Sequence, residues 1–337
     1  MKPNVSINTE LGKQNHPYLN KDVVSGRVLD EVAHRQVWMK DRLWMEAEGN
    51  KNRKSNQFDP LVSWAMKMFE WGLKSTGTFR KGFQNASNII FREQSIVIPS
   101  LPQSFNGFTI LFLSDLHLDM MPGLERAIVE LIKGREFDLC VMTGDYSTAS
   151  LGGESESLNT LGKIIQAVKS HHGILGILGN HESAHDVFAL ESVGMSMLIN
   201  ESYLLEKSGS ILQFIGTDDI RFYTDQISLV LKKSEDQCTV ALVHSPELYD
   251  RAAEAGVNLY LCGHTHGGQI CLPGGFPVMT NLKRGKKFHS GHWSYKGMQG
   301  ITNVGVGTSV LPIRFNTVGE VLSITLSNSW CSGNLIN

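Results

Sequence analysis

The chain has 337 residues, 41% of them apolar, which is enough for one large α/β domain with an extension or for two modest domains; we expect the first. Its 31 basic and 33 acidic residues give a formal net charge of -2, which excludes the basic field typical of nucleic-acid-binding proteins. The five cysteines show no paired spacing, and no stretch resembles a secretory signal or reaches the roughly 18 apolar residues of a spanning helix. We therefore expect a cytoplasmic protein with free thiols, of which Cys140 and Cys262 lie in the core.

The first 100 residues predict a tail and a helical extension that precede the main domain, residues 101–337. Residues 1–20 lack periodicity and predict a mobile tail, and residues 28–48 predict a helix. Residues 61–83 combine aromatic and lysine residues in an amphipathic pattern, with helix breaks near Gly72 and Thr76-Gly77. Two interpretations of this segment remain open. It packs on the main domain, or it lies peripherally on the inner membrane with its aromatic residues among lipid headgroups.

From Phe108 onward, short apolar runs alternate with helical stripes. The runs 110–113, 139–142, 174–178, 240–243 and 259–262 predict strands, and 124–132 and 158–168 predict helices between the first three. Alternation of this kind predicts parallel strands joined by right-handed crossovers. The later runs 211–215 and 321–326 have no following helix, and for them we predict a second sheet packed face to face on the first.

Each of the five alternating runs is followed by polar residues that bind metals well. These residues are Asp115, His117, Asp145, Asn180, His181, His244, His264 and His266. Open α/β sheets place ligand sites at the carboxyl ends of their strands, so we expect these side chains to converge. A carboxylate can bridge two cations whereas a neutral imidazole cannot, which makes Asp145 the candidate bridge.

The mixture of imidazole and carboxylate predicts two divalent transition-metal ions, manganese foremost, with iron, zinc or cobalt as alternatives. Two such ions hold a bridging hydroxide that attacks phosphorus, and His181 is placed to protonate the leaving oxygen. Any one motif alone is equally compatible with a turn or a helix cap. The presence of all five, each after a predicted strand, favours the metal centre.

These motifs resemble the calcineurin-like metallophosphoesterase superfamily, whose pattern is Asp-x-His, Gly-Asp, Gly-Asn-His-Asp/Glu, His and Gly-His-x-His. The resemblance covers residues 108–327 and implies a four-layer α/β/β/α sandwich. It implies one ion at Asp115, His117, Asp145 and His266, a second at Asp145, Asn180, His244 and His264, and action of His181 on the leaving group.

Two further stretches, 263–269 and 305–315, resemble a bacterial branch of membrane-associated phosphodiesterases. Some members of that branch cleave UDP-2,3-diacylglucosamine in lipid A synthesis, although Gly267 stands where a common form of that enzyme has arginine. Protein Ser/Thr phosphatases carry an arginine soon after Gly-Asp, whereas Tyr146 and the small residues after it follow here, which argues against a phosphoprotein substrate.

The resemblance leaves three hypotheses for the substrate. The first is a phosphodiester or pyrophosphate in a lipid sugar nucleotide, with Arg314 contacting a distal phosphate. A basic stretch is a further candidate for that contact or a solvated loop; it contains Lys283, Arg284, Lys286, Lys287, His289 and His292. The second is a phosphodiesterase or phosphomonoesterase for soluble nucleotides or small phosphate esters. The third, a degenerate fold that serves as a protein scaffold, would normally lack metal ligands, and none is missing.

Overall fold

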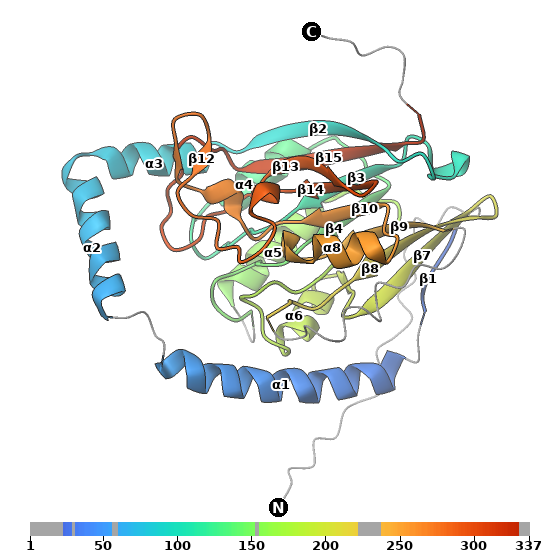
Figure 1. The fold of residues 1–337 in the computed structure, drawn as a ribbon, viewed down its shortest axis with the longest axis horizontal. Coiled ribbons are helices and arrows are strands. Elements are labelled where there is room, and N and C mark those ends of the chain that lie inside the picture. The colour runs from blue at the N-terminus through green and yellow to red at the C-terminus, as the bar shows by residue number, and fades with distance from the viewer. Residues whose placement is uncertain (1–22, 29–30, 56–59, 152–154, 222–236, 330–337) are drawn as a thin grey trace, which may run out of the picture.

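The computed structural model describes residues 23–28, 31–55, 60–151, 155–221 and 237–329, and within them two β-sheets stack face to face (Figure 1). The first sheet has the order β2 (Ile90–Val97), β15 (Glu320–Ser327), β3 (Thr109–Leu113), β4 (Leu139–Met142), β5 (Ile174–Gly176) and β6 (Ser196–Met197). The second has the order β1 (Val23–Val28), β7 (Glu201–Lys207), β8 (Ser210–Gly216), β9 (Cys238–Leu242), β10 (Leu259–Cys262), β14 (Met298–Thr302) and β13 (Gly291–Tyr295).

Alternating side chains on the strands build the four layers that the resemblance implied. In β3, Ile110 and Phe112 face the second sheet, whereas Leu111 and Leu113 face the helices on the outside. Those helices are α4 (Leu124–Ile132), α5 (Glu156–Ala167) and α6 (Asp186–Ser192), and α8 (Tyr249–Glu254) covers the outer face of the second sheet. Successive strand residues point to opposite faces, so strands buried on both faces must be apolar throughout. The α/β/β/α sandwich is confirmed.

The parallel pairing predicted for the alternating segments is also confirmed. Strands β3, β4, β5 and β6 are mutually parallel, as are β8, β9, β10 and β14. Cys140 and Cys262 are buried and free, as expected. The parallel segments therefore present their carboxyl ends at a common edge of each sheet.

The prediction of a second sheet from the two late runs is correct for one of them and wrong for the other. Residues 211–215 lie in β8 of the second sheet, but residues 321–326 lie in β15 of the first sheet, between β2 and β3. The side chains from Glu320 to Ile324 are all buried. A strand buried on both faces occupies an interior position, and the lack of a following helix carries no information about which sheet it joins.

The N-terminal region contributes to both sheets as well as forming helices. β1 pairs with β7 and β2 with β15, although both precede residue 101, where we placed the start of the main domain. The predicted helix over 28–48 is α1 (Glu31–Ser55), and the predicted tail 1–20 lies outside the described residues. The amphipathic segment forms α2 (Pro60–Ser75) and α3 (Thr78–Ser87), separated at Gly77 with φ 72°; Gly72 lies within α2 and does not break it. None of the described helices is both long and apolar enough to cross a bilayer.

Candidate metal centre

The predicted metal ligands meet at the carboxyl ends of five strands, three in the first sheet and two in the second. Asp115 and His117 follow β3, Asp145 follows β4, and Asn180 follows β5. From the second sheet, His244 follows β9, and His264 and His266 follow β10. Each of these seven side chains is at most 7% exposed. Such burial is unusual for charged and imidazole groups and requires that their polar atoms find partners.

The carboxylate of Asp145 lies between two imidazoles from different sheets. Its Oδ2 is 3.3 Å from His244 Nε2 and 3.6 Å from His117 Nε2. Asn180 Oδ1 and His264 Nδ1 each lie 3.2 Å from His244 Nε2, and Asp115 Oδ1 lies 3.5 Å from His266 Nε2. Two donor atoms bound to one ion at about 2.1 Å are themselves about 3 to 3.5 Å apart. The donor spacing therefore fits cations on both sides of Asp145.

The ring of His244 shows why this set of atoms suits a cation. Its Nδ1 lies 2.7 Å from the Thr143 carbonyl, which can only accept, so Nδ1 carries the proton and Nε2 is left facing Asn180 and Asp145. Burial disfavours a charged ring, yet the carboxylates of Asp145 and Asp115 raise the pKa of His244 to about 10. The site thus stabilises positive charge at this position, which a divalent ion would supply.

Other imidazoles of the cluster are in the neutral form that binds metals. Burial lowers the pKa of His117 to about 4 and that of His264 to about 3. The Nδ1 of His117 contacts Thr148 Oγ1 at 3.1 Å, whereas its buried Nε2 has no hydrogen-bond partner. A histidine that is held through one nitrogen and presents the other is the usual arrangement of a metal ligand.

Five of the seven residues adopt a left-handed backbone conformation that non-glycine residues rarely take. Their φ values are 51° for Asp115, 40° for His117, 56° for Asp145, 73° for His264 and 51° for His266. Each costs on the order of 1 kcal/mol or more and persists only where the surroundings enforce it. The turns point these side chains into one volume, and strain gathered at one place in the fold is typical of a functional site.

Glycines beside these residues let the two sheets approach. A Cβ at Gly179 would collide with the Asp145 carboxylate, and one at Gly263 would collide with Ser114 and with the Asp115 carboxylate. The glycine of each motif therefore provides space for a ligand from another strand, and not only freedom of turning.

Residues 108–268 match the family model described as calcineurin-like phosphoesterase. They form a calcineurin-like phosphoesterase domain. This match, together with relatives that are named metallophosphoesterases, supports a hydrolase that acts on phosphoric ester bonds.

Three relatives illustrate this likeness. An uncharacterized metallophosphoesterase of Bacillus subtilis, YkuE, is 28% identical over 246 residues, which cover 70% of this chain and 85% of the relative. An uncharacterized metallophosphoesterase of Helicobacter pylori strain 26695 is 25% identical over 261 residues, which cover 74% of this chain and 67% of the relative. A bovine transmembrane protein with metallophosphoesterase domain is 30% identical over 257 residues, covering 68% of this chain and 55% of that protein.

In this phosphoesterase domain, His181 is the half-buried member of the cluster. Its ring stands perpendicular to that of His117, with 5.0 Å between centroids, and its Nδ1 lies 3.3 Å from the Thr148 carbonyl. Its backbone N–H donates to Asp145 Oδ1 at 3.1 Å. His181 therefore lies beside the candidate ligands Asp145 and His117 and is partly exposed, and its action on a leaving group stays a prediction.

Glu182 has a role that we did not predict, although it belongs to the motif with Asn180 and His181. Its buried carboxylate accepts hydrogen bonds from the backbone N–H groups of Asp145, Tyr146 and Gly179, at 3.0, 2.8 and 2.7 Å. It thereby joins the loops after β4 and β5. The fourth position of the Gly-Asn-His-Glu motif was the available clue, because a carboxylate there serves backbone donors and not a metal.

Arg42 of α1 also supports this loop from far away in the sequence. Its guanidinium is completely buried, pairs with Asp218, and donates to the Glu182 carbonyl at 2.9 Å and to Glu46 at 2.8 Å. Glu46 in turn accepts from the N–H of Ala184 at 2.8 Å. Nothing in the local sequence pattern of α1 indicated a partner 140 residues away.

The prediction that Arg314 contacts a distal phosphate is not supported by its placement. The side chain is completely buried, and its guanidinium donates to the carbonyl oxygens of His266, Val304, Gly305 and Gly307 at 2.6 to 3.1 Å. With its donors directed at backbone oxygens, Arg314 fixes the loops behind His266. Carbonyl oxygens, and not a substrate or an acid, accept from its two terminal nitrogens, whereas its buried Nε has no hydrogen-bond partner.

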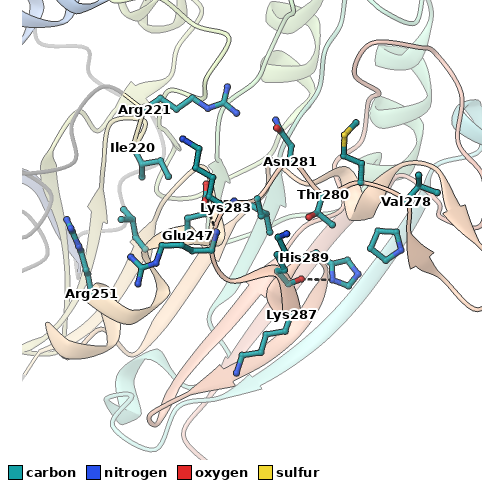
Figure 2. Close-up of a pocket in the computed structure, with 16 residues that line it drawn as sticks. Ile220, Arg221, Glu247, Arg251, Val278, Thr280, Asn281, Lys283, Lys287 and His289 are labelled. Atoms are coloured by element: carbon teal, nitrogen blue, oxygen red, sulfur yellow. Dashed lines mark hydrogen bonds between the residues drawn. The ribbon is translucent and has the colours of Figure 1, made fainter. Parts of the chain in front are cut away.

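The basic stretch after the last histidine motif divides between two places. Lys283, Arg284, Lys286, Lys287 and His289 line a cavity (Figure 2). His292 lies outside it, on β13, where its Nε2 contacts Gln299 at 2.8 Å. The cavity is also lined by Arg221, which we did not predict because it lies in a separate segment after β8.

Proposed function

We propose that this protein cleaves a phosphodiester or pyrophosphate bond with the help of two divalent cations. Asp115, His117, Asp145 and His266 would hold one cation, and Asp145, Asn180, His244 and His264 the other. The observation that carries the proposal is the position of Asp145 Oδ2, within 3.6 Å of imidazoles from both sheets. Imidazole and carboxylate donors suit manganese first, and iron, zinc or cobalt as well.

The residues around the site bind and orient the substrate's reacting phosphate. Bound cations would lower the pKa of a water molecule and neutralise the phosphoryl oxygens. His181 is assigned the transfer of a proton to the leaving oxygen, and the contact of its Nδ1 with the Thr148 carbonyl orients the ring for that task. Glu182 and Arg42 keep the His181 loop in position.

The test of this function compares two substitutions in metal-reconstituted protein. Asp145→Asn should reduce the content of both ions in elemental analysis, because one bridging carboxylate serves both. His181→Ala should retain both ions and lose about 10²- to 10⁴-fold in kcat with bis(p-nitrophenyl) phosphate. His185→Ala, an exposed histidine of the same loop, is the matched control and should keep full activity. Normal metal content in Asp145→Asn would remove the bridge assignment.

Metal removal gives a second readout that does not depend on turnover. Ions that bind only the folded protein raise its stability by mass action, so a chelator should lower the Tm of the native protein. The same chelator should leave the Tm of Asp145→Asn almost unchanged. Equal effects on both proteins would contradict the proposed ligands.

For the substrate we propose a lipid sugar nucleotide such as UDP-2,3-diacylglucosamine, presented at a membrane surface. What supports this is α2, where Trp64, Met68 and Trp71 lie on one helical face and are 61%, 44% and 65% exposed. Lys67 and Lys74 on the same helix would favour anionic lipid. Release of UMP from the detergent-solubilised lipid is the deciding assay. Inactivity there, with rapid cleavage of a soluble cyclic nucleotide, would favour the second hypothesis of a phosphodiesterase for small esters.

A further inference from the structure

A cavity of about 1420 Å³ opens beside the metal centre, on the side of the last histidine motif. Three contacts join its wall to that motif. Thr265 Oγ1 donates to the His289 carbonyl at 2.6 Å, the backbone of Asn281 hydrogen-bonds the His264 ring, and Pro277 packs so closely on Gly268 that no Cβ would fit there. The cavity wall therefore adjoins the loop that carries the candidate ligands His264 and His266.

The cavity concentrates positive charge in a protein whose net charge is -2. Its lining includes six cationic side chains, Arg221, Arg251, Lys283, Arg284, Lys286 and Lys287. The one acidic residue in the lining, Glu247, accepts from the backbone N–H groups of Lys283 and Arg284 at 2.8 and 3.0 Å, so its carboxylate is directed at the loop. A concave surface with this charge attracts anions.

The six cations differ in the partners that they already have. Arg284 pairs with Asp250, and the Lys287 ammonium lies 4.9 Å from the centroid of the Phe288 ring. Lys286, like Arg221 and Lys283, forms no ion pair within the part of the chain that the structure describes. Figure 2 shows Arg221 at one side of the cavity and Lys283 close to Glu247 within it.

The apolar side chains of Ile220, Leu248 and Leu282 complete the lining and suit the organic part of a ligand.

We propose that this cavity binds a second phosphate group of the substrate, held by Arg221 and Lys283, while the scissile phosphate occupies the metal centre. The proposal rests on the proposed hydrolase function and narrows its substrate class to organic molecules that carry two phosphoryl groups. Arginine and lysine bind phosphate through charge-assisted hydrogen bonds, each of which is strong enough to change an affinity severalfold.

The test uses two chromogenic esters that differ only in the second phosphate. One is the 5′-(p-nitrophenyl phosphate) of thymidine, and the other is the same ester with a 3′-phosphate. In the native protein, the KM should be about tenfold lower for the 3′-phosphorylated ester, which corresponds to about 1.4 kcal/mol. In Arg221→Gln/Lys283→Gln, the ratio of the two KM values should fall to about one.

A matched pair of substitutions controls for the general loss of charge. Arg126 and Lys163 lie on α4 and α5, on the outer side of the first sheet, and Arg126→Gln/Lys163→Gln should keep the tenfold preference. Lys283→Gln alone, at an exposed position, should reduce the preference in a protein of native Tm.

Equal KM values in the native protein, or an unchanged ratio in the double variant, would overturn the proposed phosphate site. Failure of the hydrolase function itself has another signature, since the native protein would then release no nitrophenol from either ester.

Discussion

Two consecutive helices, α1 and α2, use their side chains in opposite ways. α1 is the more polar in sequence, yet it sends Trp38 and the completely buried Arg42 into the sandwich. α2 is rich in apolar residues, yet Trp64 and Trp71 are more than 60% exposed. In Figure 1, α1 runs along one side of the sandwich, whereas α2 stands apart from both sheets. Burial here follows the polar partners available to a side chain and not hydropathy alone.

The difference has a clear physical origin in α1. Arg35 donates to Glu191, Glu201 and the carbonyl of Met197, and Arg42 pairs with Asp218. Most of the donors that these contacts identify meet acceptors from the main domain, and Arg42 Nε donates to Glu46 of α1 itself. Since a satisfied polar network specifies one arrangement, α1 has one place on the sandwich.

The largest effect we expect comes from breaking the α1 network at Arg42. Arg42→Met would leave the buried carboxylate of Asp218 without its cationic partner, and should lower the free energy of unfolding by about 3 to 5 kcal/mol. Urea titration measures this change. Lys40→Met, at an exposed position of the same helix, is the control and should be nearly neutral. Equal values for the two variants would show that α1 does not depend on the buried pair.

A smaller effect should follow from removing one hydrogen bond of the same network. Trp38 Nε1 donates to Asp218 Oδ2 at 2.8 Å, and Trp38→Phe keeps the aromatic packing but not the donor. We expect a loss of about 1 to 3 kcal/mol in the free energy of unfolding. Trp44→Phe, at a 66% exposed site on α1, should change it little. If Trp44→Phe cost as much, packing and not the hydrogen bond would be responsible.

The smallest effect on stability is expected in α2. Trp64→Ser/Trp71→Ser should change the free energy of unfolding by no more than about 0.5 kcal/mol per site, because both side chains are exposed. The turnover of bis(p-nitrophenyl) phosphate by this double variant should equal that of the native protein. Sedimentation with vesicles of anionic phospholipid should decrease, however, whereas Trp44→Ser should sediment as the native protein does. Undiminished sedimentation would argue against α2 as the membrane contact.

The sequence predicted the ligand-bearing loops well because their information is local. Asp115, His117 and Asp145 follow short apolar runs, and the carboxyl ends of parallel strands meet at a shared edge. The left-handed turns at these residues could not be predicted, since only the folded surroundings impose them.

Features that depend on distant partners escaped sequence analysis. The sequence suggested Arg314 as a phosphate ligand, whereas the structure shows that it donates to four backbone carbonyls. The sequence around Arg42 likewise did not indicate its hydrogen bond to the Glu182 carbonyl. The predicted assignment of residues 321–326 to the second sheet was wrong for the same reason. Periodicity reports which residues share a face, and it does not report which strand lies beside them.

The interior position of β15 has a consequence for synthesis on the ribosome. β2 and β3 both pair with β15, so neither gains this neighbour until residue 327 has emerged. Until then the nascent chain presents two unpaired strand edges, which are sites of aggregation. Chaperone binding during translation should therefore persist until β15 has emerged, and release of a polypeptide that ends before β15 should give an insoluble product.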